Sequence, residues 1–148
     1  MRGMKCAGLA ATMVAMLATV QAPAQENMVT QNNVSFVSGG VGVDSRERLQ
    51  AQEKDFNLKL VFALVEGNYL ADINVNVKDA AGKTLVEHVA DGPFFMAKLP
   101  AGAYSVTVGN NGQTQTRKVK VGDRLRTEYF RWPSNPQTDF PLPPEQRK

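Results

Sequence analysis

The feature that most constrains the fold is a period of two in the apolar residues between Phe56 and Trp132. Successive side chains of a β-strand point to opposite faces, so an alternation of apolar and polar residues predicts a strand with one buried face. Segments of this kind follow one another about ten residues apart. The seven predicted strands are Phe56 to Leu64, Ile73 to Lys78, Thr84 to Val89, Phe94 to Leu99, Tyr104 to Val108, Thr116 to Val121 and Leu125 to Trp132.

Turn-forming residues separate these segments. Asn110-Asn111-Gly112 is the strongest hairpin signal, because Asn and Gly tolerate the positive φ that tight hairpins require. Asp79-Ala80-Ala81-Gly82-Lys83 predicts a second hairpin. No helical pattern lies between the strands, which favours antiparallel pairing over a parallel α/β sheet. The sequence therefore predicts a mainly β fold, a seven-stranded antiparallel β-sandwich over residues 57–132.

The first 24 residues have the three parts of a secretory signal peptide. A basic start with Arg2 and Lys5 precedes an apolar run from Ala7 to Val20, and Ala22 and Ala24 form a small-x-small site. We expect cleavage between Ala24 and Gln25 and a periplasmic or secreted product. The alternative is an uncleaved membrane anchor, but the run is shorter than the ~20 residues that span a bilayer.

Cleavage would change the charge of the chain. Loss of two basic residues with the signal would reduce the 17 Lys and Arg to 15, against 14 Asp and Glu. A net charge near +1 gives little support for nucleic-acid binding. The single Cys, Cys6, would leave as well, so the product would have no disulfide. No second apolar run approaches membrane-spanning length, so we expect no membrane span after cleavage.

Three further segments flank the predicted strands. Residues 25–44 are polar and then glycine-rich, which predicts a flexible leader with one short strand at most. Asp44 followed three residues later by Glu47 is typical of a capping box, and predicts a short helix over 45–56. Leader and helix can together cover an open sheet edge. The proline-rich tail, 133–148, is expected to be extended and mobile.

Two segments resemble a known family. Ala71-Asp72-Ile73-Asn74-Val75-Asn76-Val77-Lys78-Asp79-Ala80-Ala81-Gly82-Lys83 and Leu99-Pro100-Ala101-Gly102-Ala103-Tyr104 are similar to carboxypeptidase regulatory-like domains. These domains are seven-stranded sandwiches of the transthyretin (prealbumin) type. The leader Val37 to Gly42 and the ending Tyr129 to Trp132 look like an uncharacterised group of exported proteobacterial proteins that carry this domain. The resemblance implies an accessory or adhesive role and no catalytic residues.

Several kinds of site are not supported by the residues. One His and one Cys cannot form a histidine-rich zinc site. Ser38 to Gly42 lacks the Lys-Ser/Thr pair of a nucleotide loop, and a flexible connector explains it better. Asp72-x-Asn74-x-Asn76 lacks the glycine and glutamate that complete a calcium loop. We therefore expect no metal, no cofactor and no catalytic residue.

The last predicted strand carries the best candidate for a binding surface. Basic and aromatic residues gather there, and Arg and Trp are favoured at interface hot spots. The alternative is an ordinary solvated strand face. The candidate surface, for an anionic envelope component or a protein, consists of Arg124, Arg126, Phe130, Arg131 and Trp132.

Three functional hypotheses remain. The first is a non-enzymatic exported module that binds an envelope protein or a glycan in the bacterial periplasm. The second is a small hydrolase or isomerase that uses His88 with a nearby carboxylate such as Asp91. The third is a structural envelope or secretion component whose edge strand adds to the sheet of a partner.

Overall fold

The computed structural model describes residue 3 and residues 28–134. The predicted signal peptide, its cleavage site and all but the first two residues of the predicted tail lie outside the described residues, so they stay predictions. Within the described part of the chain, no helix is long and apolar enough to cross a membrane.

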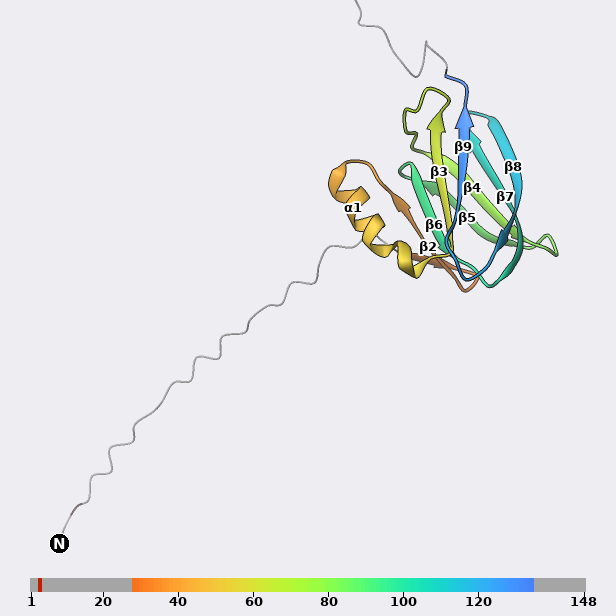
Figure 1. The fold of residues 1–148 in the computed structure, drawn as a ribbon. Coiled ribbons are helices and arrows are strands. Elements are labelled where there is room, and N and C mark those ends of the chain that lie inside the picture. The colour runs from red at the N-terminus through yellow and green to blue at the C-terminus, as the bar shows by residue number, and fades with distance from the viewer. Residues whose placement is uncertain (1–2, 4–27, 135–148) are drawn as a thin grey trace, which may run out of the picture.

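The chain is mainly β, with one short helix and two stacked sheets (Figure 1). The first sheet, sheet A, has the strand order β1-β2-β6-β3-β9, and the second, sheet B, has the order β5-β4-β7-β8. The strands are β1 Val29–Gln31, β2 Val34–Gly39, β3 Leu58–Leu64, β4 Ile73–Asp79, β5 Thr84–Ala90, β6 Phe94–Lys98, β7 Gly102–Asn110, β8 Gln113–Val121 and β9 Arg126–Trp132.

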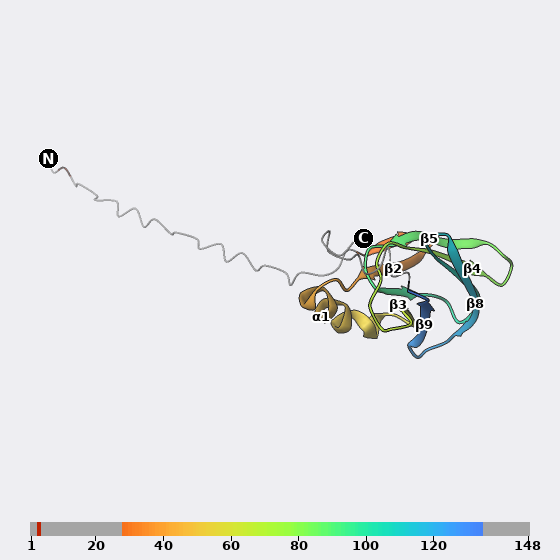
Figure 2. The same ribbon diagram turned by 90° about the horizontal axis from the view of Figure 1, so that it is seen from above.

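The core lies between the two sheets. One cluster of buried side chains joins Phe36, Leu60 and Phe95 of sheet A to Val75 and Val106 of sheet B. Figure 2 shows the two layers from above. The buried side chains of the core cluster lie between them. The stacked layers are compatible with a β-sandwich, because each sheet turns its alternating apolar face toward the other.

The predicted strands are confirmed within two or three residues at either end, and so are both hairpins. Asn111 and Gly112 have φ values of 48° and 81°, as a tight turn between twisted strands requires. Tyr104 begins the core-facing row of β7, and its hydroxyl donates a hydrogen bond to the Pro100 carbonyl at 2.5 Å. This bond explains why the Leu99-to-Tyr104 segment ends in a tyrosine, since the hydroxyl closes the turn that precedes the core-facing row of β7.

The fully antiparallel prediction is wrong at one pair, because β3 and β9 run parallel. Both strands begin at the same end of the molecule, where Arg126 N donates to the Asn57 carbonyl. The Asn57 side chain holds this end together by bonding Leu99 N and O at 2.9 and 2.6 Å and Gly122 O at 3.2 Å. The chain therefore crosses from β8 in sheet B to enter sheet A beside β3 in the same direction.

The prediction of a flexible leader is wrong for residues 29–39. They form β1 and β2, which raise the number of strands within residues 28–134 to nine, and β2 pairs with β6 inside sheet A. Phe36 faces the core between the sheets and Val37 faces the helix, so β2 is buried on both faces. The following glycine also packs tightly: a Cβ on Gly40, which has a φ of 101°, would lie 2.2 Å from the Phe94 ring.

The helix α1, Val43–Gln52, continues into a short 3-10 turn, Glu53–Asp55, and covers part of the outer side of sheet A (Figure 1). Leu49 and Phe56 pack there against Val37 and Met96. The capping-box prediction is wrong. The N-cap is Gly42, whose φ of 84° turns the chain sharply into the helix, and no side chain caps it. Asp44 thus lies in the first turn rather than before it.

Candidate functional site

The structure separates the five residues of the predicted binding surface. Phe130 and Trp132 are 0% and 1% exposed and belong to the core. Arg124, Arg126 and Arg131 are exposed. The prediction that these residues form one surface is therefore wrong for the two aromatic side chains.

The reason lies in the core-facing row of β9. Its first members are polar, Arg126 and Glu128, and they lie at the open end of the layers, where Arg126 Nε donates to Glu128 at 2.7 Å. The guanidinium of Arg117 also reaches Glu128, at 3.4 Å, and lies 4.5 Å from the centre of the Phe130 ring. Alternation places Arg126, Glu128, Phe130 and Trp132 on one face of β9. It does not tell which end of that face is covered.

The opposite row of β9 faces outward and includes Tyr129. A second exposed tyrosine, Tyr69, lies on the other side of β3. Tyr129 and Tyr69 are 54% and 55% exposed, although tyrosines usually bury most of their ring. Tyr69 lies in the loop after β3 and bridges to Ala63. We use the name tyrosine face for this outer part of sheet A, which consists of Val61, Ala63, Tyr69, Phe94, Tyr129 and Arg131.

Two rows of side chains build the tyrosine face across three adjacent strands. Strand register places Phe94 and Tyr129 on either side of Val61. In the next row Tyr69 and Arg131 flank Ala63. Neighbouring strands are ~4.8 Å apart, so the flanking groups are about 10 Å apart across a floor of small side chains. The rings of Tyr69 and Phe94 also contact each other, with centroids 5.4 Å apart.

The charge of this face is positive. Lys59 is paired with Glu53 and lies 5.1 Å from the centre of the Phe94 ring. Arg131 lies 5.9 Å from the centre of the Tyr129 ring and has no ion pair among the described residues. Sequence reasoning missed Tyr69, because it follows a break in the strand pattern at Glu66-Gly67-Asn68. An aromatic residue in such a break was the available signal.

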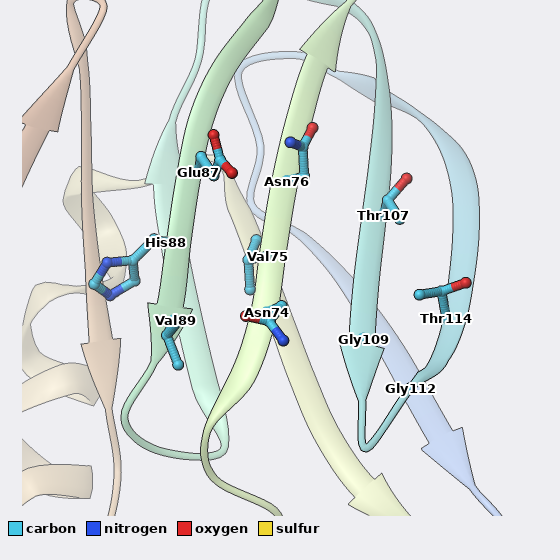
Figure 3. Close-up of a pocket in the computed structure, with 10 residues that line it drawn as sticks. All are labelled: Asn74, Val75, Asn76, Glu87, His88, Val89, Thr107, Gly109, Gly112 and Thr114. Atoms are coloured by element: carbon cyan, nitrogen blue, oxygen red, sulfur yellow. The ribbon is translucent and has the colours of Figure 1, made fainter.

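The outer face of sheet B is polar and contains a cavity of about 510 Å³ (Figure 3). Two adjacent rows line it. One row places Asn74 beside Gly109, and the other places Asn76 between Glu87 and Thr107. The strand alternation that buries Val75 and Val77 turns these polar side chains outward. Figure 3 shows Asn74, Asn76, Thr107 and Thr114 pointing to the outer side, and His88 pointing away toward β2.

His88 takes part in a cluster with Ser38 and Asp91. The Ser38 hydroxyl donates to Asp91 Oδ1 at 2.5 Å and lies 3.0 Å from His88 Nε2. In a nucleophilic triad the histidine accepts the serine proton and the carboxylate holds the histidine. Here the serine hydroxyl donates its hydrogen bond to the carboxylate instead of to the histidine. Ser38 is also buried, and its bonds to His88 and Asp91 link β2 to the end of β5.

Side-chain groups cover the outward backbone groups at both sides of the layers. Beside β5, Gln31 bonds both N and O of Glu87, and Asn32 donates to Leu85 O. Beside β9, Gln115 donates to Arg131 O at 2.8 Å and Arg117 to Tyr129 O at 2.6 Å. These groups take the place of a neighbouring strand.

Comparisons with known proteins add no family assignment. No family model matches the chain, and no curated protein matches it. Among residues 28–134, no three His, Cys, Asp or Glu side chains are grouped so that they could hold a metal ion.

Proposed function

We propose that this chain is an exported, non-enzymatic module with a transthyretin-like β-sandwich, and that its tyrosine face binds a protein partner in the periplasm. The observation that carries the proposal is the exposure of Tyr69 and Tyr129 around a floor of small side chains, with Arg131 beside them. Tyr and Arg are the residue types that contribute most at interface hot spots. The rigid, amphipathic side chain of tyrosine buries a large area at a low entropic cost.

The helix supports the choice of this face. It covers the outer side of sheet A at β2 and β6, where Leu49 packs on Val37 and Met96. The remaining part, over β3 and β9, keeps Tyr69 and Tyr129 exposed, while Val61 and Ala63 are buried beneath the surrounding side chains. A partner that packs on this part would extend the layer that the helix forms over β2 and β6.

The charge favours an acidic partner surface. The Arg131 guanidinium has no counterion among the described residues, and Arg124, just before β9, is exposed. A carboxylate of the partner placed between Arg131 and Tyr129 would gain a charge-assisted hydrogen bond. Of the two partner classes expected from the sequence, protein or glycan, the tyrosine face favours the protein.

The two other hypotheses have less support. An enzyme based on His88 would need the serine proton to pass to the imidazole, whereas Ser38 donates to Asp91. Edge-strand addition would need free backbone groups, and at the edges β5 and β9 the side chains of Gln31, Gln115 and Arg117 bond some of them. The first observation counts against the enzyme, and the second leaves β1 and β8 as the edges open to addition.

The test compares partner capture by a variant of the tyrosine face with capture by a control variant on an exposed strand of the other sheet. We would cross-link the tagged protein in intact cells and quantify bound proteins by mass spectrometry. The double variant Tyr129→Ser/Arg131→Ser should lose the captured protein, and the control Thr116→Ala/Lys120→Ser, on the exposed side of β8, should keep it. Equal capture by both variants would refute the proposal. N-terminal sequencing of the same exported protein should begin at Gln25.

A further inference from the structure

The cavity on the outer face of sheet B has the size of a small-molecule site. Its volume of about 510 Å³ lies within the ~300–1,000 Å³ that is usual for ligand pockets. The site lies on the opposite sheet from the tyrosine face, and therefore does not depend on the proposed protein partner.

Hydrogen-bonding groups of several kinds line the cavity. The amides of Asn74 and Asn76 each offer donors and an acceptor, and the Glu87 carboxylate accepts only. The hydroxyl of Thr107 lies 2.9 Å from that of Thr116 and completes the set. Vicinal sugar hydroxyls, which donate and accept at once, match a surface that combines amides, a carboxylate and hydroxyls.

Two of these groups have no partner in the described structure. Asn76 Oδ1 is buried and has no hydrogen bond, which is unfavourable for an amide oxygen. The Glu87 carboxylate has no hydrogen bond or ion pair with a described residue, although Gln31 holds its backbone in place. A ligand hydroxyl can donate to the exposed Glu87 carboxylate at a position that the sheet already fixes, whereas Asn76 Oδ1 is closed to solvent.

The floor of the cavity includes Gly109, the last residue but one of β7. A glycine inside a strand weakens it and often marks a place where a ligand approaches the backbone closely. A Cβ on Gly109 would lie 3.4 Å from Thr114 Cγ2 and 3.8 Å from Asn74 Cβ, so the fold itself has room for alanine. Nothing in the packing of the chain requires glycine here, whereas the flat face of a sugar ring would.

Lysines follow the cavity along the same face. Lys78 and Lys118 flank Ser105 in the next row, ~6.6 Å further along the strands, and line a second cavity of about 370 Å³. Neither lysine has an ion pair among the residues described, and the nearby Asp79 carboxylate is engaged with backbone N–H groups of its own turn. Along the strands, the outer face of sheet B therefore changes from the amides and the single carboxylate of the cavity to the two cations Lys78 and Lys118.

We propose that this outer face of sheet B binds an acidic oligosaccharide. A neutral sugar unit lies over Gly109, with its hydroxyls on Asn76 and Glu87, and the carboxylate of the adjoining unit pairs with Lys78 and Lys118. A protein partner is disfavoured here, because the rows that line the cavity have Val89 as their only large apolar side chain and no exposed aromatic ring.

The test uses the full chain and two matched tetrasaccharides in isothermal titration calorimetry. Hyaluronan tetrasaccharide alternates uronate and N-acetylglucosamine units, and chitotetraose has N-acetylglucosamine units without the carboxylates. We expect saturable binding of the hyaluronan tetrasaccharide, at least ~10-fold weaker binding of chitotetraose, and strong weakening by added salt. The double variant Lys78→Gln/Lys118→Gln should remove the difference between the two sugars.

Variants of the floor locate the site. Gly109→Ala should weaken binding at least ~10-fold without lowering the melting temperature, since alanine is more favourable than glycine in a strand. The exposed Asn74→Ala gives a second variant that leaves the core untouched. Gly102→Ala, at the start of the same strand and with its nearest atom 3.9 Å away, is the matched control and should bind as the unmodified chain does.

Three results would overturn the proposal: no saturable binding of the hyaluronan tetrasaccharide, equal affinity for chitotetraose, or undiminished affinity in both Gly109→Ala and Asn74→Ala. The variant Tyr129→Ser/Arg131→Ser separates this proposal from the protein-binding one. It should leave sugar binding unchanged, and loss of sugar binding in that variant alone would place the sugar on the tyrosine face and contradict the sheet B site.

Discussion

Substitution of two adjacent residues of β9 should destabilise the fold to very different extents. Phe130 is 0% exposed, and its ring lies 6.3 Å from that of Phe62 in the core. Replacement of a buried phenylalanine by alanine costs about 3–5 kcal/mol of unfolding free energy, and loss of the Arg117 contact adds about 0.5–1 kcal/mol. Arg131 is exposed, so Arg131→Ser should change stability by less than about 0.5 kcal/mol.

These values can be converted to melting temperatures. For a domain of ~60–100 residues, 1 kcal/mol shifts the midpoint by about 4–8 °C. Phe130→Ala should therefore lower the midpoint by at least ~12 °C, and Arg131→Ser by no more than ~4 °C, in circular dichroism melts. Phe130→Leu, which conserves most of the volume, should cost less than about 1.5 kcal/mol and keeps the comparison possible if the alanine variant does not fold. Equal shifts for Phe130→Ala and Arg131→Ser would refute the assignment of β9.

Three further predictions concern single contacts. Asn57→Ala should lower the unfolding free energy by about 2–3 kcal/mol in urea titrations, because the backbone N–H and C=O of Leu99 both lose their partner. A loss below about 0.5 kcal/mol, as expected for a neutral surface change, would contradict this prediction. Gln31→Ala should free the edge of β5 and produce concentration-dependent association in size-exclusion chromatography, whereas an unchanged monomer would show that this amide does not protect the edge. Burial, and then the charge of Asp79, raise the pKa of Tyr104 above its usual value, so the folded state holds this proton more tightly than the unfolded state. Stability should consequently fall as the pH rises above about 10, and urea titrations across this pH range should show the loss in the unmodified chain and not in Tyr104→Phe.

The strands of sheet B could be predicted because each has one buried and one open face. In β4, Ile73, Val75 and Val77 are buried, and the residues between them are open to the polar face. Such strands display the period of two directly. The hairpins that join them are short, so the turn residues define the register as well.

The strand β2 could not be predicted in the same way. It is covered on both sides, by the core at Phe36 and by the helix at Val37, so the alternation disappears. Its end also consists of Ser38 and glycines, which are typical of loops but here permit close packing against Phe94. Burial on two faces is a tertiary property that a local pattern does not contain.

The candidate site was predicted only in part for a related reason. The pattern of β9 divides its residues correctly into two rows, but it does not state which row faces the core. Polar Arg126 and Glu128 made the core-facing row look exposed, and their ion pair at the open end of the layers explains their presence there. The tyrosine face also combines Tyr69 and Tyr129 from distant segments, which only the register around β3 brings together.

The central claim is that a protein partner covers the tyrosine face, and site-specific photo-cross-linking tests it most directly. A photoreactive phenylalanine analogue would replace Tyr129 in one exported variant and exposed Thr116, on the outer face of sheet B, in the other. We expect one discrete cross-linked protein from position 129, none from position 116, and loss of the product when Arg131→Ser is added. Equal products from both positions, or no product from position 129, would contradict the claim.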